Sequence, residues 1–122
     1  QGLDVSINGD GSDRLDFTYI GDLVQGIVCV LSNEKSKNET FNLTYGESRS
    51  IAEMADILGQ HFPKIDIHYL PKDNLTPSRG TLSVDKARKL IGYEPRCPLE
   101  KGFVDYIRWY QSAWEKLKES GA

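Results

Sequence analysis

The feature that most constrains the fold is a helix start placed directly after a strand-like segment and a glycine. Residues 50–53 read Ser-Ile-Ala-Glu, a capping box in which the Ser and Glu side chains satisfy free N–H groups of a first helical turn. Residues 40–45 are rich in β-forming side chains and are followed by Gly46, so they predict a strand. A strand, a glycine turn and an amphipathic helix in this order predict an α/β fold. The apolar residues of the helix recur at helical spacing until Pro63 ends the pattern: Ile51, Met54, Ala55, Leu58 and Phe62.

Two more segments alternate apolar and polar residues and predict short, half-exposed strands. They are residues 4–8, which a Gly-Asp-Gly-Ser turn follows, and residues 65–70. Residues 17–20 are predicted to form a further short extended piece.

A helix is expected to open at Gly21, with Asp22 as its N-cap. Cys29 lies inside the apolar pattern of this helix and is predicted to be a buried thiol. The residues expected to form the buried face of the helix are Leu23, Ile27, Val30 and Leu31.

Two helices are expected in the last third of the chain. The first is short, has Ser83 as its cap and closes at Gly92, a residue typical of the position after a helix end. The second starts near Pro98 or Leu99 and runs to about Lys118. Its apolar stripe is Leu99, Phe103, Tyr106, Ile107, Tyr110, Ala113, Trp114 and Leu117.

Composition and charge limit the classes of function. The 122 residues suit one small domain or part of a larger one. A formal net charge of -3 predicts no general attraction to nucleic acid or to an anionic membrane. The longest apolar run, residues 27–31, is far shorter than the roughly 20 residues of a membrane span. Because residues 1–5 lack the pattern of a signal peptide, a cytoplasmic location is expected.

The sequence contains none of the local motifs that mark a catalytic, cofactor or metal site. There is no Gly-x-x-Gly-x-x-Gly cradle for a dinucleotide, no Walker loop and no Gly-x-Ser-x-Gly nucleophile turn. The two cysteines and the two histidines lack the spacing of metal ligands. Catalytic, cofactor-binding and metal-binding residues are therefore predicted to be absent from this chain.

Several blocks, taken in order, resemble the C-terminal portion of the extended short-chain dehydrogenase/reductase family. Residues 7–11 read Ile-Asn-Gly-Asp-Gly, and residues 15–24 are similar to the family's Arg-Asp-Phe-x-Tyr-Val-x-Asp block. Residues 41–51 resemble its Phe-Asn-hydrophobic, Gly and Ser-hydrophobic series. Residues 85–102 resemble its Lys-Ala, Leu-Gly-Tyr-x-Pro and Leu-x-x-Gly ending. The branch that this order indicates is the NAD-dependent sugar-nucleotide epimerases and dehydratases, similar to UDP-glucose 4-epimerase.

The resemblance implies that the two parts of a family member have different roles. In the family, the first part of the chain binds NAD(P) on a Rossmann sheet and supplies a Tyr-x-x-x-Lys pair, and neither feature occurs here. Residues 1–122 are therefore expected to be the C-terminal part of a Rossmann-type fold, with a small substrate-binding lobe and without the dinucleotide-binding part. NAD(P) is implied for the parent enzyme, and this chain alone is not expected to be catalytically competent.

The resemblance also implies substrate-binding residues for a nucleoside diphosphate sugar. Ser6 and Asn8 correspond to a segment that meets the nucleobase, and Arg79 resembles an arginine that grips the diphosphate, as the fork of a guanidinium suits phosphate oxygens. The family's second diphosphate arginine is replaced by Leu15. Arg14, next to it, is the fourth candidate, although a shift of one residue in an extended segment turns a side chain to the opposite face.

One alternative stays open. The chain is either part of an enzyme or a stand-alone, non-enzymatic module that binds nucleotide sugars or another partner. In both cases neither nucleic acid nor a membrane is an expected partner. The predicted strand at residues 40–45 would leave an open sheet edge, so self-association through that edge is expected.

Overall fold

The computed structural model describes residues 4–72, 75, 77 and 79–119 and contains two small sheets and four α-helices in those ranges. Strand β1 (Val5–Asn8) pairs in parallel with β4 (Ile67–Leu70), with Val5 opposite Ile67 and Asn8 opposite Leu70. Strand β2 (Arg14–Leu15) pairs antiparallel with β3 (Arg49–Ser50). The helices are α1 (Ile20–Leu31), α2 (Ile51–His61), α3 (Asp85–Ile91) and α4 (Leu99–Glu119), and a 3-10 turn covers Glu34–Ser36. The structure therefore confirms the predicted α/β class.

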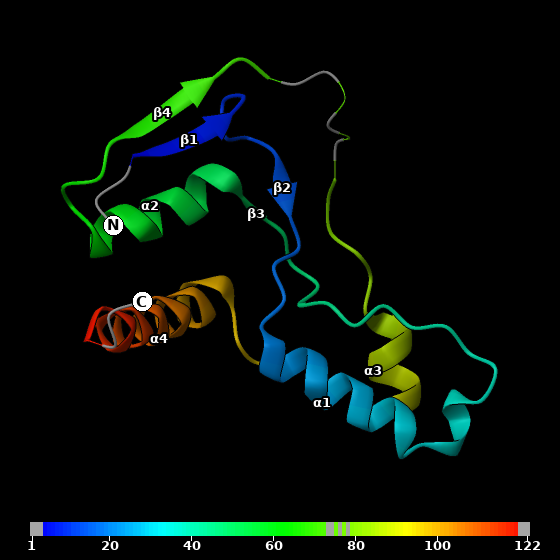
Figure 1. Ribbon diagram of the computed structural model, residues 1–122. Coiled ribbons are helices and arrows are strands. Elements are labelled where there is room, and N and C mark those ends of the chain that lie inside the picture. The colour runs from blue at the N-terminus through cyan, green and yellow to red at the C-terminus, as the bar shows by residue number, and fades with distance from the viewer. Residues whose placement is uncertain (1–3, 73–74, 76, 78, 120–122) are drawn as a thin grey trace.

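Two groups of elements are joined by extended links (Figure 1). The first group holds β1, β4 and α2, and α4 packs beside α2. The second group holds α1 and α3, which lie on the other side of β2 and β3 in Figure 1. The chain crosses between the groups at residues 16–19, at residues 44–48, before α3 and again between α3 and α4. Described residues from the first three of these crossings line a polar cavity.

The principal core lies in the second group and is built around Tyr93. Its ring is fully buried, and its hydroxyl donates to the carbonyl oxygen of Thr44 at 3.0 Å. Burial raises the pKa of this phenol to about 12. The buried residues of the cluster are Val84, Ala87, Ile91 and Tyr93, and the partly buried ones packed on them are Cys29, Val30, Phe41, Leu43 and Leu90.

Several elements begin or end where the local sequence pattern predicts. The capping box is present, since the Glu53 N–H donates to Ser50 Oγ at 3.1 Å and the Ser50 N–H donates to Glu53 Oε2 at 2.6 Å. Gly92 follows α3 with a φ of 71°, in the left-handed region that favours glycine. Helix α4 begins at Leu99, as the sequence predicts.

Two predicted caps are wrong. Tyr19 is the N-cap of α1, and Asp22 lies in the first turn, where its carboxylate accepts the N–H groups of Arg96 and Cys97 instead. Val84 is the N-cap of α3, although the hydroxyl of Ser83 accepts the N–H of Asp85 at 3.3 Å. Helix α1 therefore begins earlier than expected, with the Asp22 carboxylate bonded to the chain near α4, whereas α3 begins one residue later than expected.

One predicted strand does not form. Residues 40–45 are not a strand, because no other described backbone segment pairs with residues 41–45. The extended piece predicted at residues 17–20 ends at Tyr19, whose backbone is extended, because α1 already begins at Ile20. A strand needs a neighbour to bond its N–H and C=O groups, and β-forming side chains alone do not supply one.

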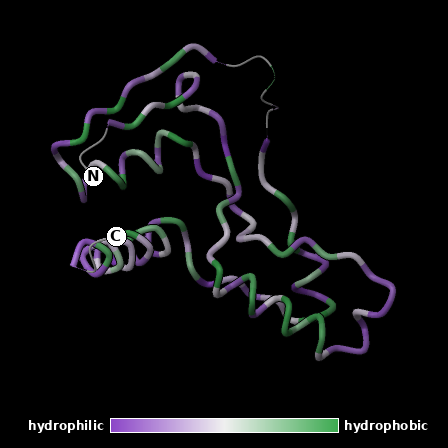
Figure 2. The backbone as a smooth tube through the Cα atoms, viewed as in Figure 1, coloured by the Kyte–Doolittle hydropathy of each residue, from purple (hydrophilic) through white to green (hydrophobic). Residues whose placement is uncertain are grey.

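The expected burial of α1 is only partly met, since Leu23 and Val30 are partly buried whereas Ile27 and Leu31 are exposed. The only buried residue of α1 is Gly26, and hydrophobic residues run along the exposed length of the helix (Figure 2). The exposed fractions of these side chains are Ile20 64%, Val24 51%, Ile27 45%, Val28 54% and Leu31 81%. Cys29 is only partly buried, while Cys97 is the buried thiol, and burial raises its pKa. No helix in the described ranges combines the length and the apolar character that crossing a membrane requires.

Gly26 sets how closely α1 approaches the core, which predicts opposite effects for two Gly→Ala substitutions. A Cβ at position 26 would lie 2.8 Å from Cε2 of Tyr93, whereas a Cβ at Gly59 in α2 would have nothing within 4 Å. Gly26→Ala should lower the free energy of unfolding by about 1–3 kcal/mol through overpacking. Gly59→Ala should raise it by up to about 1 kcal/mol, because alanine favours the helix. Urea unfolding of both variants measures this, and equal stabilisation by both would contradict the packing argument.

Candidate functional site

A polar cavity lies where the chain crosses between the two groups of elements and has a volume of about 580 Å³. It is open to solvent and combines one basic side chain with apolar walls. The residues that line it are Leu15, Asp16, Phe17, Thr18, Thr44, Arg79, Gly80 and Leu82. Three separate parts of the sequence therefore build this site.

Asp16 joins these three parts. Its carboxylate accepts the N–H of Gly46 at 3.1 and 3.2 Å and the N–H of Leu82 at 3.3 Å. Gly46 has a φ of 87°, a conformation that side chains with a Cβ rarely adopt. Nearby, the N–H of Ser48 donates to Oγ1 of Thr81 at 3.1 Å. These bonds hold the loop that carries Arg79 against residues 44–48.

Sequence reasoning did not find the role of Asp16. The residue lies inside one of the blocks that carry the family resemblance, which was the only available signal. Its partners lie 30 and 66 positions away along the chain, and nothing in the local pattern indicates them.

Arg79 is exposed and is the only basic residue among the described residues that line the cavity. A guanidinium in this position can form two parallel hydrogen bonds with a phosphate or a carboxylate. The hydroxyl oxygen of Thr44 is buried and has no hydrogen-bond partner among the described residues. The cavity thus offers one strong anion-binding group.

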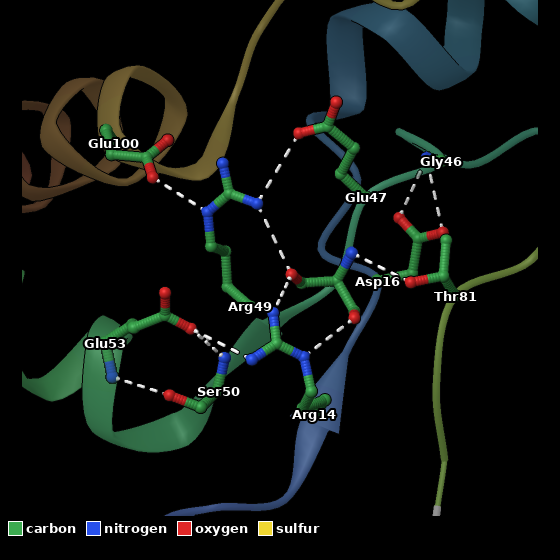
Figure 3. A network of polar contacts seen from close by, with 10 residues as sticks. Arg14, Asp16, Gly46, Glu47, Arg49, Ser50, Glu53, Thr81 and Glu100 are labelled. Carbon is green, nitrogen blue, oxygen red and sulfur yellow. Dashed lines mark hydrogen bonds and ion pairs between the residues drawn. The ribbon is translucent and has the colours of Figure 1, made fainter.

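Leu15 and Arg14 lie on opposite faces of β2. Leu15 lines the cavity, while Arg14 turns away and donates to the carbonyl oxygen of Ser48 at 2.6 Å and to its Oγ at 3.1 Å. Arg14 also lies 3.6 Å from the carboxylate of Glu53. Figure 3 shows the Arg14 guanidinium beside Glu53 at the start of α2, with the Asp16 carboxylate pointing toward Gly46. Of the four candidate site residues, Arg79 alone lines this cavity.

Ser6 and Asn8 lie on the same exposed face of β1, opposite His68 and Leu70 of β4. Neither residue lines the polar cavity or the apolar cavity described next. The structure therefore does not bring the two nucleobase candidates together with Arg79 in one of these cavities.

A second cavity of about 400 Å³ adjoins the first, since Phe17 and Thr18 line both. Its walls are mainly apolar and come from the start of α1, from α2 and from the start of α4. The remaining residues that line it are Tyr19, Ile20, Met54, Cys97, Pro98, Leu99, Gly102, Phe103 and Tyr106.

A network of charged side chains holds α4 against the loop that follows Gly46 (Figure 3). Arg49 Nε donates to Glu100 Oε1 at 2.9 Å, and its Nη1 lies 3.6 Å from Glu47 Oε2. The hydrogen bond to Glu100 raises the pKa of Arg49. Bonds from the Glu100 backbone N–H and from Arg49 lower the pKa of the Glu100 carboxyl. No group of three or more His, Cys, Asp or Glu that could hold a metal ion occurs in the part of the chain that the structure describes.

Comparison with known proteins identifies the relatives of this fold. Residues 1–44 match the model of the NAD dependent epimerase/dehydratase family. A protein of Bacillus subtilis named an uncharacterized UDP-glucose epimerase is 32% identical over 115 residues, which are 91% of this chain and 35% of that protein. The resemblance to the NAD-dependent epimerase/dehydratase family is confirmed.

Solved structures of epimerases extend this likeness to nearly the whole chain. An epimerase of Methanothermobacter thermautotrophicus has a TM-score of 0.88 and 30% identity, over 98% of this chain and 36% of that one. UDP-glucuronic acid 4-epimerase of Bacillus cereus, solved with UDP-glucuronic acid and NAD, has a TM-score of 0.77 and 29% identity, over 88% of this chain and 36% of that one. The chain thus has the fold of part of a Rossmann-type extended short-chain dehydrogenase and spans about a third of the length of these relatives.

The Arg49–Glu100 pair predicts a pH dependence of stability. Because the pKa of Glu100 lies below its ordinary value of 4.5 in the folded chain, its contribution is present above about pH 4.5 and is lost as the pH falls through the lower folded value. Glu100→Gln should therefore lower the melting temperature at neutral pH, and the difference from the wild type should shrink as the pH falls below 4.5. Glu115→Gln, in the same helix, is the control and should show no such change. A difference for Glu100→Gln that is constant with pH would contradict this.

Proposed function

We propose that this chain is the part of an NAD(P)-dependent sugar-nucleotide epimerase or dehydratase that binds the nucleoside diphosphate sugar. The observation that carries this proposal is the position of Arg79 in the polar cavity, held by the bonds of Asp16 and Thr81 to residues 46 and 48. The planar fork of a guanidinium suits a phosphate group, because it can donate two parallel hydrogen bonds to the phosphate oxygens. The UDP-glucuronic acid bound by the Bacillus cereus relative supports this class of ligand.

Hydride transfer is not proposed for this chain alone. The sequence holds neither the glycine-rich dinucleotide cradle nor a Tyr-x-x-x-Lys pair. NAD(P) would therefore be bound by a separate dinucleotide-binding part. The cytoplasmic location expected from the sequence stays a prediction.

The exposed side of α1 and residues 41–45 form a surface on which that dinucleotide-binding part would pack. Five apolar side chains of α1 face solvent, from Ile20 to Leu31, and exposed apolar patches of this kind mark contact surfaces. Residues 41–45 lie beside α1, since Leu43 contacts Gly26, and their backbone groups pair with no other described backbone segment. We propose that a sheet of the dinucleotide-binding part packs on this surface. The alternative of a stand-alone binding module fits less well, because a self-sufficient domain would bury the apolar stripe of α1.

The substitution Arg79→Ala tests whether this chain binds a nucleoside diphosphate sugar through the polar cavity. Calorimetric titration of the chain with uridine and thymidine diphosphate sugars should show binding, and Arg79→Ala should weaken it by about tenfold to a hundredfold, the cost of a lost charged hydrogen-bond pair. Arg96→Ala is the matched control, since Arg96 pairs with Glu94 and does not line the cavity. An Arg79→Ala variant that binds like the wild type would contradict the role of Arg79 in binding. A wild type that binds none of these sugars would contradict the proposed function.

The open surface predicts self-association when the chain is studied alone. Light scattering at high concentration should give a mass above that of the 13.7 kDa monomer, because the stripe of α1 and residues 41–45 find partners on another copy. Substituting Val24 and Val28 together by Glu should reduce the mass, whereas Gln25→Glu in the same helix should not. A wild type that stays monomeric would contradict the prediction.

A further inference from the structure

We propose that α4 is a contact surface between two copies of this chain, which pair through antiparallel α4 helices with Asp105 of each copy facing Lys116 of the other. This surface is independent of the ligand of the polar cavity and goes beyond the proposed function. The exposed aromatic face of α4 and the order of the charges along one edge of that face support this pairing.

The outer face of α4 is aromatic from Tyr106 to Tyr110. The exposed fractions of the side chains are 53% for Tyr106, 63% for Trp109 and 40% for Tyr110, although α2 packs beside this helix (Figure 1). The rings contact one another, since the ring centre of Tyr106 lies 5.8 Å from that of Trp109 and 6.3 Å from that of Tyr110. Exposed apolar patches mark contact surfaces, and tryptophan and tyrosine often supply most of the binding energy of a protein interface. This aromatic face is therefore expected to have a protein partner.

One edge of the aromatic face carries opposite charges at its two ends. Asp105 and Lys116 are about three helical turns apart, so both lie on the same side of α4, next to Trp109. The Asp105 side chain is 41% exposed and lies 3.6 Å from Arg108 of the same helix. Lys116 is exposed, and no ion pair within the described part of the chain involves it. This edge is acidic toward the start of the helix and basic toward its end, so it is complementary to a reversed copy of itself.

The order of the charges favours a second copy over a partner of another kind. In an antiparallel pair of helices, the same edges face each other, so Asp105 of either copy meets Lys116 of the other. The same alignment brings Tyr106 and Trp109 of each copy close to Ala113 of the other, whose small side chain leaves room for the rings. A different partner, such as the dinucleotide-binding part, would require no such symmetry of charge.

Sedimentation equilibrium of the full chain tests this pairing in a background of Val24→Glu and Val28→Glu, which removes association through α1. At concentrations up to about 1 mM, the mass of this background chain should approach twice that of the 13.7 kDa monomer. Lys116→Asp and Asp105→Lys each place like charges at both contacts of the pair. Each of these variants alone should raise the dissociation constant of the dimer at least about tenfold.

A mixture of the two single variants tests the antiparallel order itself. In an equimolar mixture, Lys116→Asp and Asp105→Lys chains restore opposite charges at both contacts, so the mixture should dimerise like the background chain. Glu115→Lys changes the charge by the same amount as Asp105→Lys, but on the exposed side of α4 opposite Tyr106. This control should dimerise like the background chain.

Each outcome decides for or against the pairing. A background chain that stays monomeric overturns the inference. A dimer that both charge variants leave unchanged also overturns it, and is expected if another face joins the copies or if α4 is covered by the dinucleotide-binding part. A mixture that stays monomeric, from variants with the circular dichroism spectrum of the background chain, overturns the antiparallel order. If the background chain does not fold, the same charge variants in the wild type decide, because they should lower its mass in the same way.

Discussion

The Asp16 carboxylate is the contact on which the organisation of the site depends. Residues 16–18, 44–48 and 79–82 belong to no strand or helix, and side-chain bonds help to hold these links in place. Asp16 supplies them by accepting the N–H groups of Gly46 and Leu82, and Ser48 and Thr81 add a bond alongside. A carboxylate satisfied by backbone donors costs little to keep partly buried. The position of Arg79 follows from this arrangement.

The alternation of side chains along β2 then decides the charge of the cavity. Adjacent residues of a strand face opposite sides, so Leu15 lines the cavity while Arg14 reaches Ser48 and Glu53. An exchange of only these two residues would bring a second guanidinium to the cavity. The pleat therefore decides which of two adjacent side chains lines the cavity.

The exposed side of α1 relates this chain to the longer proteins that it resembles. Tyr93 and its neighbours bury one side of α1 through Gly26, and the apolar side chains opposite remain in solvent. Burial of such a stripe is normally worth more than any surface ion pair of this chain. The chain spans about a third of the length of its relatives, which supports the proposal that a dinucleotide-binding part covers the stripe.

The sequence by itself determined the elements whose bonds are local. The capping box of α2, the left-handed Gly92 and the long α4 depend on contacts within four residues, and all three were predicted. The ordered blocks also indicated the family. Only the tertiary structure decided that residues 40–45 form no strand, that Asp22 bonds Arg96 and Cys97, and that Asp16 joins segments 30 and 66 positions away. The physical reason is that a strand, a buried face and a carboxylate each need a partner. These partners can lie far away along the chain, and the local sequence pattern does not predict which residues they are.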